Sequence, residues 1–195
     1  MAVRKAALLT VSFSSQRAWE KWLAAQSADA LGVWLKLPKK AAPEPSVTKA
    51  EAIESALTHG WIDGQIGAFD AHWFVTRFTP RRAQSRWSKI NCATAERLIG
   101  EGRMQPAGLA EVERAKADGR WDAAYAGQAS AAVPKDLKAA LDASPKAKAF
   151  FKTLNSVNRY AILYRVGDAK KPETRAARIA KFIAMLERGE RIHEK

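Results

Sequence analysis

The sequence has a single cysteine, three histidines and no long apolar run. Cys92 has no second cysteine to pair with, so an internal disulfide is excluded and a reducing compartment is expected. The three histidines, His59, His72 and His193, do not show the spacing of metal ligands. No stretch approaches the roughly 20 apolar residues that a membrane-spanning helix needs. We therefore expect a cytoplasmic protein without a bound metal or a membrane span.

Familiar catalytic signatures are also missing. The sequence contains no phosphate loop and no GxGxxG, GxSxG or HExxH motif, each of which marks a well-known class of site. The sequence indicates no particular reaction and no cofactor, and it favours a protein that is not an enzyme. The N-terminal segment has a basic start and a short apolar run over residues 6–13, as a signal peptide has. It lacks a small-x-small cleavage site, so we interpret the run as a first strand.

Positive charge is what the sequence has in excess. It contains 33 Lys and Arg residues against 20 Asp and Glu residues, which gives a net charge of +13 and an isoelectric point of about 10.1. Such an excess favours polyanions such as nucleic acid, anionic membranes or phosphorylated ligands, although solubility alone also explains it. The hydrophobic fraction of 47% is enough to fill a core, so we expect a globular protein.

Hydrophobic spacing and turn residues predict an α+β fold class: a small antiparallel sheet with packed helices, followed by an all-helical C-terminal half. Residues 1–90 would form the sheet-containing part and residues 91–195 the helical part. The Ala- and Gly-rich stretch 123–132 is a candidate linker, and the two parts could also pack as one domain. In the first part we expect a strand over residues 31–37 and a helix that starts with a capping box at residues 48–51.

Two runs rich in β-branched and aromatic residues, 60–68 and 72–78, predict a hairpin closed by the three-residue loop 69–71. In this register position 63 pairs with 77, 65 with 75 and 67 with 73, and paired residues share a face. The face toward the core would hold Ile62, Gly64, Ile66, Ala68, His72, Phe74, Thr76 and Phe78. The opposite face would hold Trp61, Asp63, Gln65, Trp73, Val75 and Arg77.

The hairpin and its exit form a basic, aromatic segment. Between Ala71 and Asn91 the chain carries five basic residues and no acidic residue. Phosphates bind lysine and arginine, and unpaired bases stack on aromatic rings. We therefore predict a surface for an anionic partner, either nucleic acid or a phosphorylated ligand, made of Arg77, Arg81, Arg82, Arg86, Lys89, Trp73 and Trp87. In the alternative interpretation the arginines pair with acidic residues of the helical half and the tryptophans belong to the core.

A second hypothesis places an enzyme or small-molecule pocket on the polar hairpin face, around Trp61, Asp63, Gln65, Trp73 and Arg77. Asp63 opposite Arg77 would act there as a general base or a ligand contact, or else as one half of a cross-strand ion pair. A third hypothesis is a protein–protein adaptor in a stress response, which predicts an exposed apolar patch.

Two further positions have both a functional and a structural interpretation. Cys92 lies at a predicted helix N-terminus beside Lys89, where its thiol would be either activated or simply packed. Residues 170–175, with Arg178 one turn later, surround a predicted helix start. They would bind an anion there or form local ion pairs on a solvated helix.

The chain also resembles a known family, and several short segments carry the resemblance. They are Gly60-Trp61-Ile62-Asp63-Gly64, Arg77-Phe78-Thr79-Pro80-Arg81-Arg82, Trp87-Ser88-Lys89-Ile90-Asn91, Arg97-Leu98-Ile99, Gly102-Arg103-Met104, Asp118-Gly119-Arg120-Trp121 and Ala169-Lys170-Lys171-Pro172-Glu173-Thr174-Arg175 with Arg178-Ile179. In order and content these segments resemble the YdeI/OmpD-associated, or bacteriocin-protection, family from about Trp19 to His193.

The resemblance implies more about the fold than about activity. The α+β part of the family is similar to the YjbR/CyaY-like superfamily, which has a small antiparallel sheet backed by helices. Some relatives are labelled as possible DNA-binding proteins with wing-like hairpins, and the family names suggest envelope stress or bacteriocin resistance. The acidic ridge with which CyaY-like proteins bind iron is absent from this sequence, so the resemblance does not extend to iron binding. We expect an anionic partner to bind the basic hairpin.

Overall fold

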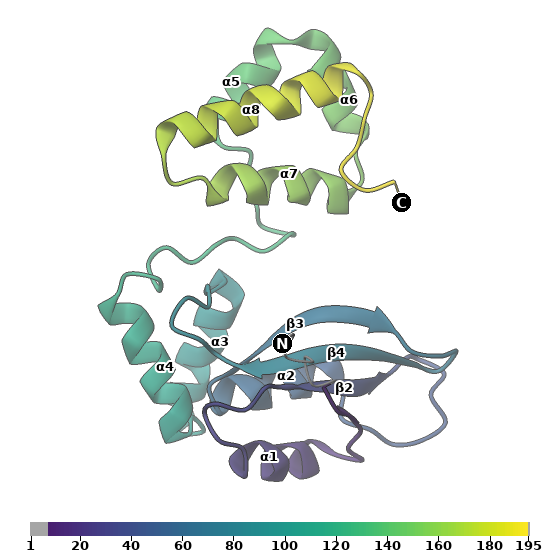
Figure 1. Cartoon of the computed structure of the whole chain (residues 1–195), viewed down its shortest axis with the longest axis vertical. Coiled ribbons are helices and arrows are strands. Elements are labelled where there is room, and N and C mark those ends of the chain that lie inside the picture. The colour runs from purple at the N-terminus through teal and green to yellow at the C-terminus, as the bar shows by residue number, and fades with distance from the viewer. Residues whose placement is uncertain (1–7, 195) are drawn as a thin grey trace, which may run out of the picture. The chain divides into compact units, whose positions relative to one another are not determined.

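The computed structural model of the chain describes residues 8–194. The chain forms two compact units, Met1–Ala124 and Tyr125–Lys195 (Figure 1). Their boundary lies within the Ala- and Gly-rich stretch 123–132. The first unit includes two helices over residues 89–117, whereas the prediction ends the sheet-containing part at residue 90.

The first unit contains four strands and four helices within its described residues. In chain order they are β1 (Thr10–Val11), α1 (Gln16–Ala24), β2 (Val33–Pro38), α2 (Lys49–Thr58), β3 (Trp61–Ala68), β4 (Trp73–Pro80), α3 (Lys89–Gly100) and α4 (Pro106–Ala117). Of the first strand expected over residues 6–13, positions 6 and 7 lie outside the described residues. The predicted capping box is confirmed, because Thr48 accepts from the Glu51 backbone N–H while the Glu51 carboxylate accepts from the Thr48 N–H.

The four strands form one sheet in the order β1-β2-β4-β3. The neighbours β2–β4 and β3–β4 are antiparallel, and the short edge strand β1 runs parallel to β2. The α+β class is therefore confirmed, with a mixed sheet in place of the purely antiparallel sheet expected. The pairing of β2 with β4 joins segments that are about 40 residues apart in sequence, and this pairing decides which side chains share a face.

Helices α1 and α2 cover one face of the sheet (Figure 1). That face carries Leu35 from the middle of β2 and Phe78 from β4, both fully buried. Trp19 of α1 packs on Phe78 with 5.4 Å between ring centroids, and its indole N–H donates to the Ala52 carbonyl in α2 at 3.1 Å. Burying each such side chain contributes about 1.5–3 kcal/mol, so this core holds both helices against the sheet.

Helices α3 and α4 pack at the end of the sheet where β3 begins (Figure 1). Their buried residues form a second cluster around Trp87, Leu98 and Val112. Gly108 brings α4 close to α2, because a Cβ at this position would collide with the Thr58 carbonyl oxygen. A glycine is therefore required where the two helices touch.

The hairpin register predicted from the sequence is wrong. In the structure Asp63 pairs with Phe78, Ile66 with Thr76 and Ala68 with Phe74, with a β-bulge between Asp63 and Ile66. The connection between the strands has four residues, because the Asp70 side chain accepts from the backbone N–H groups of residues 72 and 73, both at 2.8 Å. The longer loop moves the pairs near the turn by an even number of positions, so Ile66 and Phe74 stay on one face as predicted. The β-bulge adds the odd shift that moves Trp61 and Asp63 to the side of Phe78.

The second unit is a bundle of four helices within the described residues: α5 (Lys135–Ala143), α6 (Pro145–Thr153), α7 (Ser156–Asp168) and α8 (Pro172–Glu187). Its core is built around Leu137, Phe151, Ile162, Phe182 and Leu186. Over residues 8–194 no helix is both long and apolar enough to cross a membrane.

The basic residues at the start of α8 serve the bundle itself. Arg175 pairs with Asp136 of α5 and donates to the Val166 carbonyl at 2.8 Å. Arg178 donates to the Arg165 carbonyl at 2.5 Å. Both arginines thus donate to carbonyl groups in the last turn of α7, and Arg175 adds to the bond that the Val166 carbonyl accepts from the Ala169 N–H at the helix end. For these two residues the structural interpretation of the basic segment is the one the geometry supports.

Candidate binding surface

The pairing of β2 with β4 gathers aromatic and basic side chains on the sheet face opposite α1 and α2. Trp34 pairs with Arg77, and Lys36 pairs with Val75. The alternation of side chains along a strand places these four residues, with Trp73, on one face. We call Trp34, Lys36, Trp73, Val75 and Arg77 the aromatic sheet face.

The aromatic sheet face is positively charged. Strands β2 and β4 contain no acidic residue. The Lys36 ammonium lies 4.7 Å from the centroid of the Trp73 ring and 4.8 Å from that of Phe69, in cation–π contacts. Among residues 8–194 the buried Nε of the half-buried Arg77 has no hydrogen-bond partner. The Lys36 ammonium and the half-buried Arg77 guanidinium therefore both add positive charge to this face.

The two tryptophans expected to stack on bases are buried. Trp73 is 7% exposed and Lys36 already covers its ring, while Trp87 is 1% exposed inside the cluster of α3 and α4. Arg81 is 5% exposed. Its guanidinium carbon lies 3.6 Å from the centroid of the Trp87 ring. Trp87 and Arg81 thus stabilise the loop between β4 and α3, and neither presents a broad surface.

The remaining predicted basic residues lie along the same loop and at the first residue of α3. Arg82 and Lys89 are exposed, and Arg86 is half-buried. A residue outside this loop also holds it in place, because the Arg120 side chain donates to the Ser85 carbonyl at 2.8 Å. The basic segment therefore divides into exposed and inward-facing residues, which the sequence does not distinguish.

The predicted pocket set does not converge on one face. Trp61 is 4% exposed and packs in the core with Phe78. Asp63 shares that side of the hairpin through its pairing with Phe78. Trp73 and Arg77 lie on the other face, and Gln65 is an exposed residue within the bulged segment. The β-bulge between Asp63 and Ile66 moves Trp61 and Asp63 away from the face that the pocket hypothesis assigns to them.

Trp34, Lys36 and Phe69 lie at this surface but are not among the residues that the sequence predicts for it. The signal for the first two lies in the strand sequence Val33-Trp34-Leu35-Lys36-Leu37, where aliphatic residues alternate with an indole and an amine. The aliphatic residues are all buried, at 1% exposure or less. Alternation of this kind predicts one core face and one accessible face. Phe69 has no such signal, because its position follows from the loop geometry.

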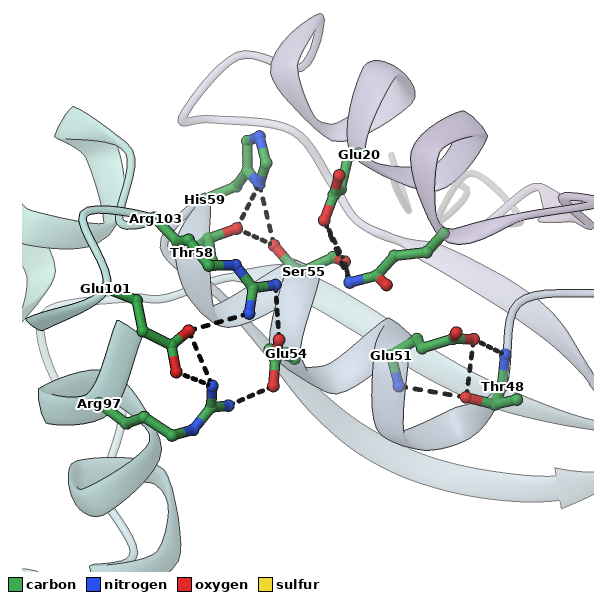
Figure 2. Close-up of polar contacts among 11 residues, drawn as sticks. Glu20, Thr48, Glu51, Glu54, Ser55, Thr58, His59, Arg97, Glu101 and Arg103 are labelled. Carbon is green, nitrogen blue, oxygen red and sulfur yellow. Dashed lines mark hydrogen bonds and ion pairs between the residues drawn. The ribbon is translucent and has the colours of Figure 1, made fainter. Parts of the chain in front are cut away.

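An ion-pair cluster near the end of α2 is structural. Figure 2 shows Glu54 between Arg97 and Arg103, both of which also contact Glu101. Hydrogen bonds with the two arginines, first that with Arg97, lower the pKa of Glu101, and hydrogen bonds with the carboxylates, first with Glu101, raise the pKa of both arginines. The cluster joins α2 to α3 and to the loop that follows α3.

Cys92 has the environment of a packed thiol. It is 8% exposed in the cluster of α3 and α4. Burial first, and the negative charge of Glu96 second, raise the pKa of the thiol, while Arg81 opposes this effect. A raised pKa reduces the thiolate fraction and therefore the nucleophilicity of the sulfur.

Comparisons with known proteins cover most of the chain with two family descriptions. Residues 130–189 match the family described as "Bacteriocin-protection, YdeI or OmpD-Associated", which confirms the expected resemblance for that segment. Residues 11–111 match a different description, "Domain of unknown function (DUF8412)". No curated protein and no solved structure matches the chain. The match over residues 11–111 spans more than half of the sequence, so the chain belongs to the DUF8412 family and carries a YdeI/OmpD-associated segment after that domain.

Proposed function

We propose that the first unit binds single-stranded nucleic acid on the aromatic sheet face. The observation that supports this best is the cross-strand pair of Trp34 and Arg77, an indole beside a guanidinium on strands that carry no acidic residue. Aromatic rings displayed on a sheet bind unpaired bases by stacking, and neighbouring cations bind the phosphates.

Two aromatic side chains are placed to stack on bases. Trp34 is half-buried, so its ring is held in place while part of it stays accessible. Phe69 is 51% exposed and contacts Lys36, which lies two residues beyond Trp34 on the same strand face. A strand of nucleic acid along this face would therefore meet a ring, a cation and a second ring in turn.

Charge supports the same partner. The net charge of +13 raises the local concentration of any polyanion and speeds its association. Duplex DNA is a poorer fit, because its bases are stacked inside the helix and offer no free ring face. The exposed residues Arg82 and Lys89 extend the positive surface beyond β4.

The test is fluorescence anisotropy with labelled single-stranded RNA, single-stranded DNA and a duplex of the same sequence. We expect the single strands to bind more tightly than the duplex. If Lys36 and Arg77 neutralise two phosphates, log K should fall with log salt at a slope of about −1.4 for a single strand. Trp34→Ala should weaken binding by about 5- to 150-fold, because stacking on one base contributes about 1–3 kcal/mol.

The matched control is Lys49→Gln, which removes one positive charge from the first turn of α2, on the covered side of the sheet. It should leave binding of the single strands within about twofold of the unchanged protein, since it alters only the long-range charge. Absence of binding at low salt contradicts the proposal. Equal affinities for the unchanged protein, Trp34→Ala and Arg77→Gln contradict it as well.

A further inference from the structure

We infer that the first unit has a second, separate ligand site, which takes a small phosphate monoester in a groove around His59. The site does not depend on nucleic-acid binding, because none of its residues belongs to the aromatic sheet face. It lies between α1, the turn from α2 to β3, and the start of α4.

The groove consists of two neighbouring cavities. One has a volume of about 350 Å³ and is lined on its apolar side by Leu23, Trp61 and Pro106. The other has a volume of about 560 Å³ and is lined mainly by polar and charged side chains. His59 lines both cavities. A ligand that occupies the groove would therefore place an apolar part and a charged part on either side of this ring.

Two contacts of its Nδ1 atom fix the orientation of the His59 ring. Its Nδ1 lies 2.9 Å from the Ser55 carbonyl oxygen and 2.9 Å from Thr58 Oγ1. A carbonyl oxygen only accepts, so Nδ1 must carry the proton that forms this contact. In the neutral ring Nε2 is then a hydrogen-bond acceptor. Figure 2 shows this second nitrogen pointing away from Ser55 and Thr58.

The polar cavity holds more positive than negative charge. Its cations are Arg17, Lys21 and Arg103, and its one carboxylate is Glu20. Glu20 already accepts a hydrogen bond from the Ser55 hydroxyl at 2.9 Å. Arg103 is paired with carboxylates of the ion-pair cluster. Arg17 and Lys21, both exposed on α1, are the cations most available to an anion.

Two features of the apolar cavity add to the positive potential. Arg81, which is 5% exposed, lines this cavity, and the one carboxylate of its lining, Glu111, is paired with Arg114. Helix α4 begins there with Pro106, and its N-cap residue Gln105 makes no side-chain capping bond. The first backbone N–H groups of α4 therefore have no side-chain cap, and the helix dipole at this end favours negative charge.

These features together identify the chemistry of the ligand. Arg17 and Lys21 suit a phosphate group, and Leu23, Trp61 and Pro106 suit a flat apolar body. A monoester carries a divalent anion near neutral pH, which uses two cations better than a single carboxylate does. A hydroxyl or N–H group on the ligand would donate to Nε2 of His59.

The probes are phenyl phosphate, inorganic phosphate and phenol, titrated into the full chain while the NMR signals of the His59 ring are followed. We expect phenyl phosphate to shift these signals in a saturable way and to bind more tightly than inorganic phosphate. Phenol, which lacks the anion, should cause no saturable shift at the same concentrations. The double variant Arg17→Gln/Lys21→Gln should weaken binding of phenyl phosphate by about tenfold or more, because hydrogen bonds to charged groups contribute about 1.5–3 kcal/mol each.

Both substituted residues are exposed on α1, so the double variant should unfold at the same temperature as the unchanged protein. Lys49→Gln removes a lysine outside the groove and should bind phenyl phosphate as the unchanged protein does. The site is ruled out if phenyl phosphate leaves the His59 signals unchanged. It is also ruled out if Arg17→Gln/Lys21→Gln and Lys49→Gln reduce affinity equally, since only the overall charge would then matter. Nucleic-acid binding is assigned to a different face and is measured separately. Either of the two proposals can therefore fail while the other holds.

Discussion

The guanidinium of Arg81 lies 3.6 Å from the centre of the Trp87 ring, and both side chains are almost fully buried. A desolvated cation–π contact of this kind contributes about 2 kcal/mol. Arg81 also donates to the Arg86 carbonyl at 3.2 Å. Part of the basic segment that follows β4 therefore holds the loop between β4 and α3 in place.

Replacing Trp87 should destabilise the first unit. Trp87→Ala removes a ring that is 1% exposed, and such truncations cost about 3–5 kcal/mol in the free energy of unfolding. All seven tryptophans lie in the first unit, so tryptophan fluorescence during urea unfolding reports on that unit alone. Arg82→Ala, at an exposed position of the same loop, should change the free energy by no more than about 0.5 kcal/mol. A loss below about 1 kcal/mol for Trp87→Ala would contradict the burial described.

Gly108 and Gly100 should respond in opposite directions to the same substitution. In an ordinary helix position Gly→Ala stabilises by up to about 1 kcal/mol. At Gly108 in α4 the new Cβ would collide with the Thr58 carbonyl and lie 2.8 Å from Met104 Cε, so Gly108→Ala should destabilise the first unit by about 1–3 kcal/mol. Gly100→Ala at the end of α3 meets nothing within 4 Å and should be neutral or stabilising. Equal effects in urea unfolding would show that α4 does not press on α2 at this point.

The Asp142 carboxyl in the second unit should titrate well below its usual range. Lys138 Nζ lies 2.7 Å and Lys148 Nζ 2.8 Å from its oxygens. These two hydrogen bonds lower the pKa of Asp142 from 3.8 to about 2. Because the folded pKa lies below the unfolded one, the stabilisation is complete above about pH 4 and is lost as the pH falls through about 2.

Carboxyl-carbon NMR measures this titration directly. Lys138→Gln/Lys148→Gln should move the pKa of Asp142 back toward 3.8, and added salt should move it in the same direction by screening the pairs. A midpoint near 3.8 in the unchanged protein would mean that the two lysines do not hold the carboxylate.

Local features of the fold could be predicted from the sequence. The capping box of Thr48 and Glu51 was found because both partners lie within one turn. The hairpin was found from its β-rich runs, but its register was not. The loop length depends on how the Asp70 side chain accepts from two backbone N–H groups, and the β-bulge after Asp63 then shifts the remaining pairs. No residue pattern in this chain predicts the loop length or the position of the β-bulge.

The candidate surface was predicted only in part, for a related reason. Arg77 was identified from local charge, whereas its neighbour Trp34 becomes part of the surface only through the pairing of β2 with β4. Trp87 was expected at the surface but is buried, because its surroundings come from α3 and α4, which follow it in the chain. Contacts between distant segments decide which aromatic residues are accessible, and residue spacing does not contain that information.

The position of Trp34 on an accessible, positively charged sheet face is the central claim, and indole N–H NMR tests it most directly. Single-stranded RNA added to the full chain should shift the Trp34 signal in a saturable way. The signals of Trp19 and Trp87, which are 0% and 1% exposed, should stay nearly unchanged and serve as internal controls. If RNA binds while the Trp34 signal does not move, or if no tryptophan signal responds at low salt, the aromatic sheet face is not the binding surface.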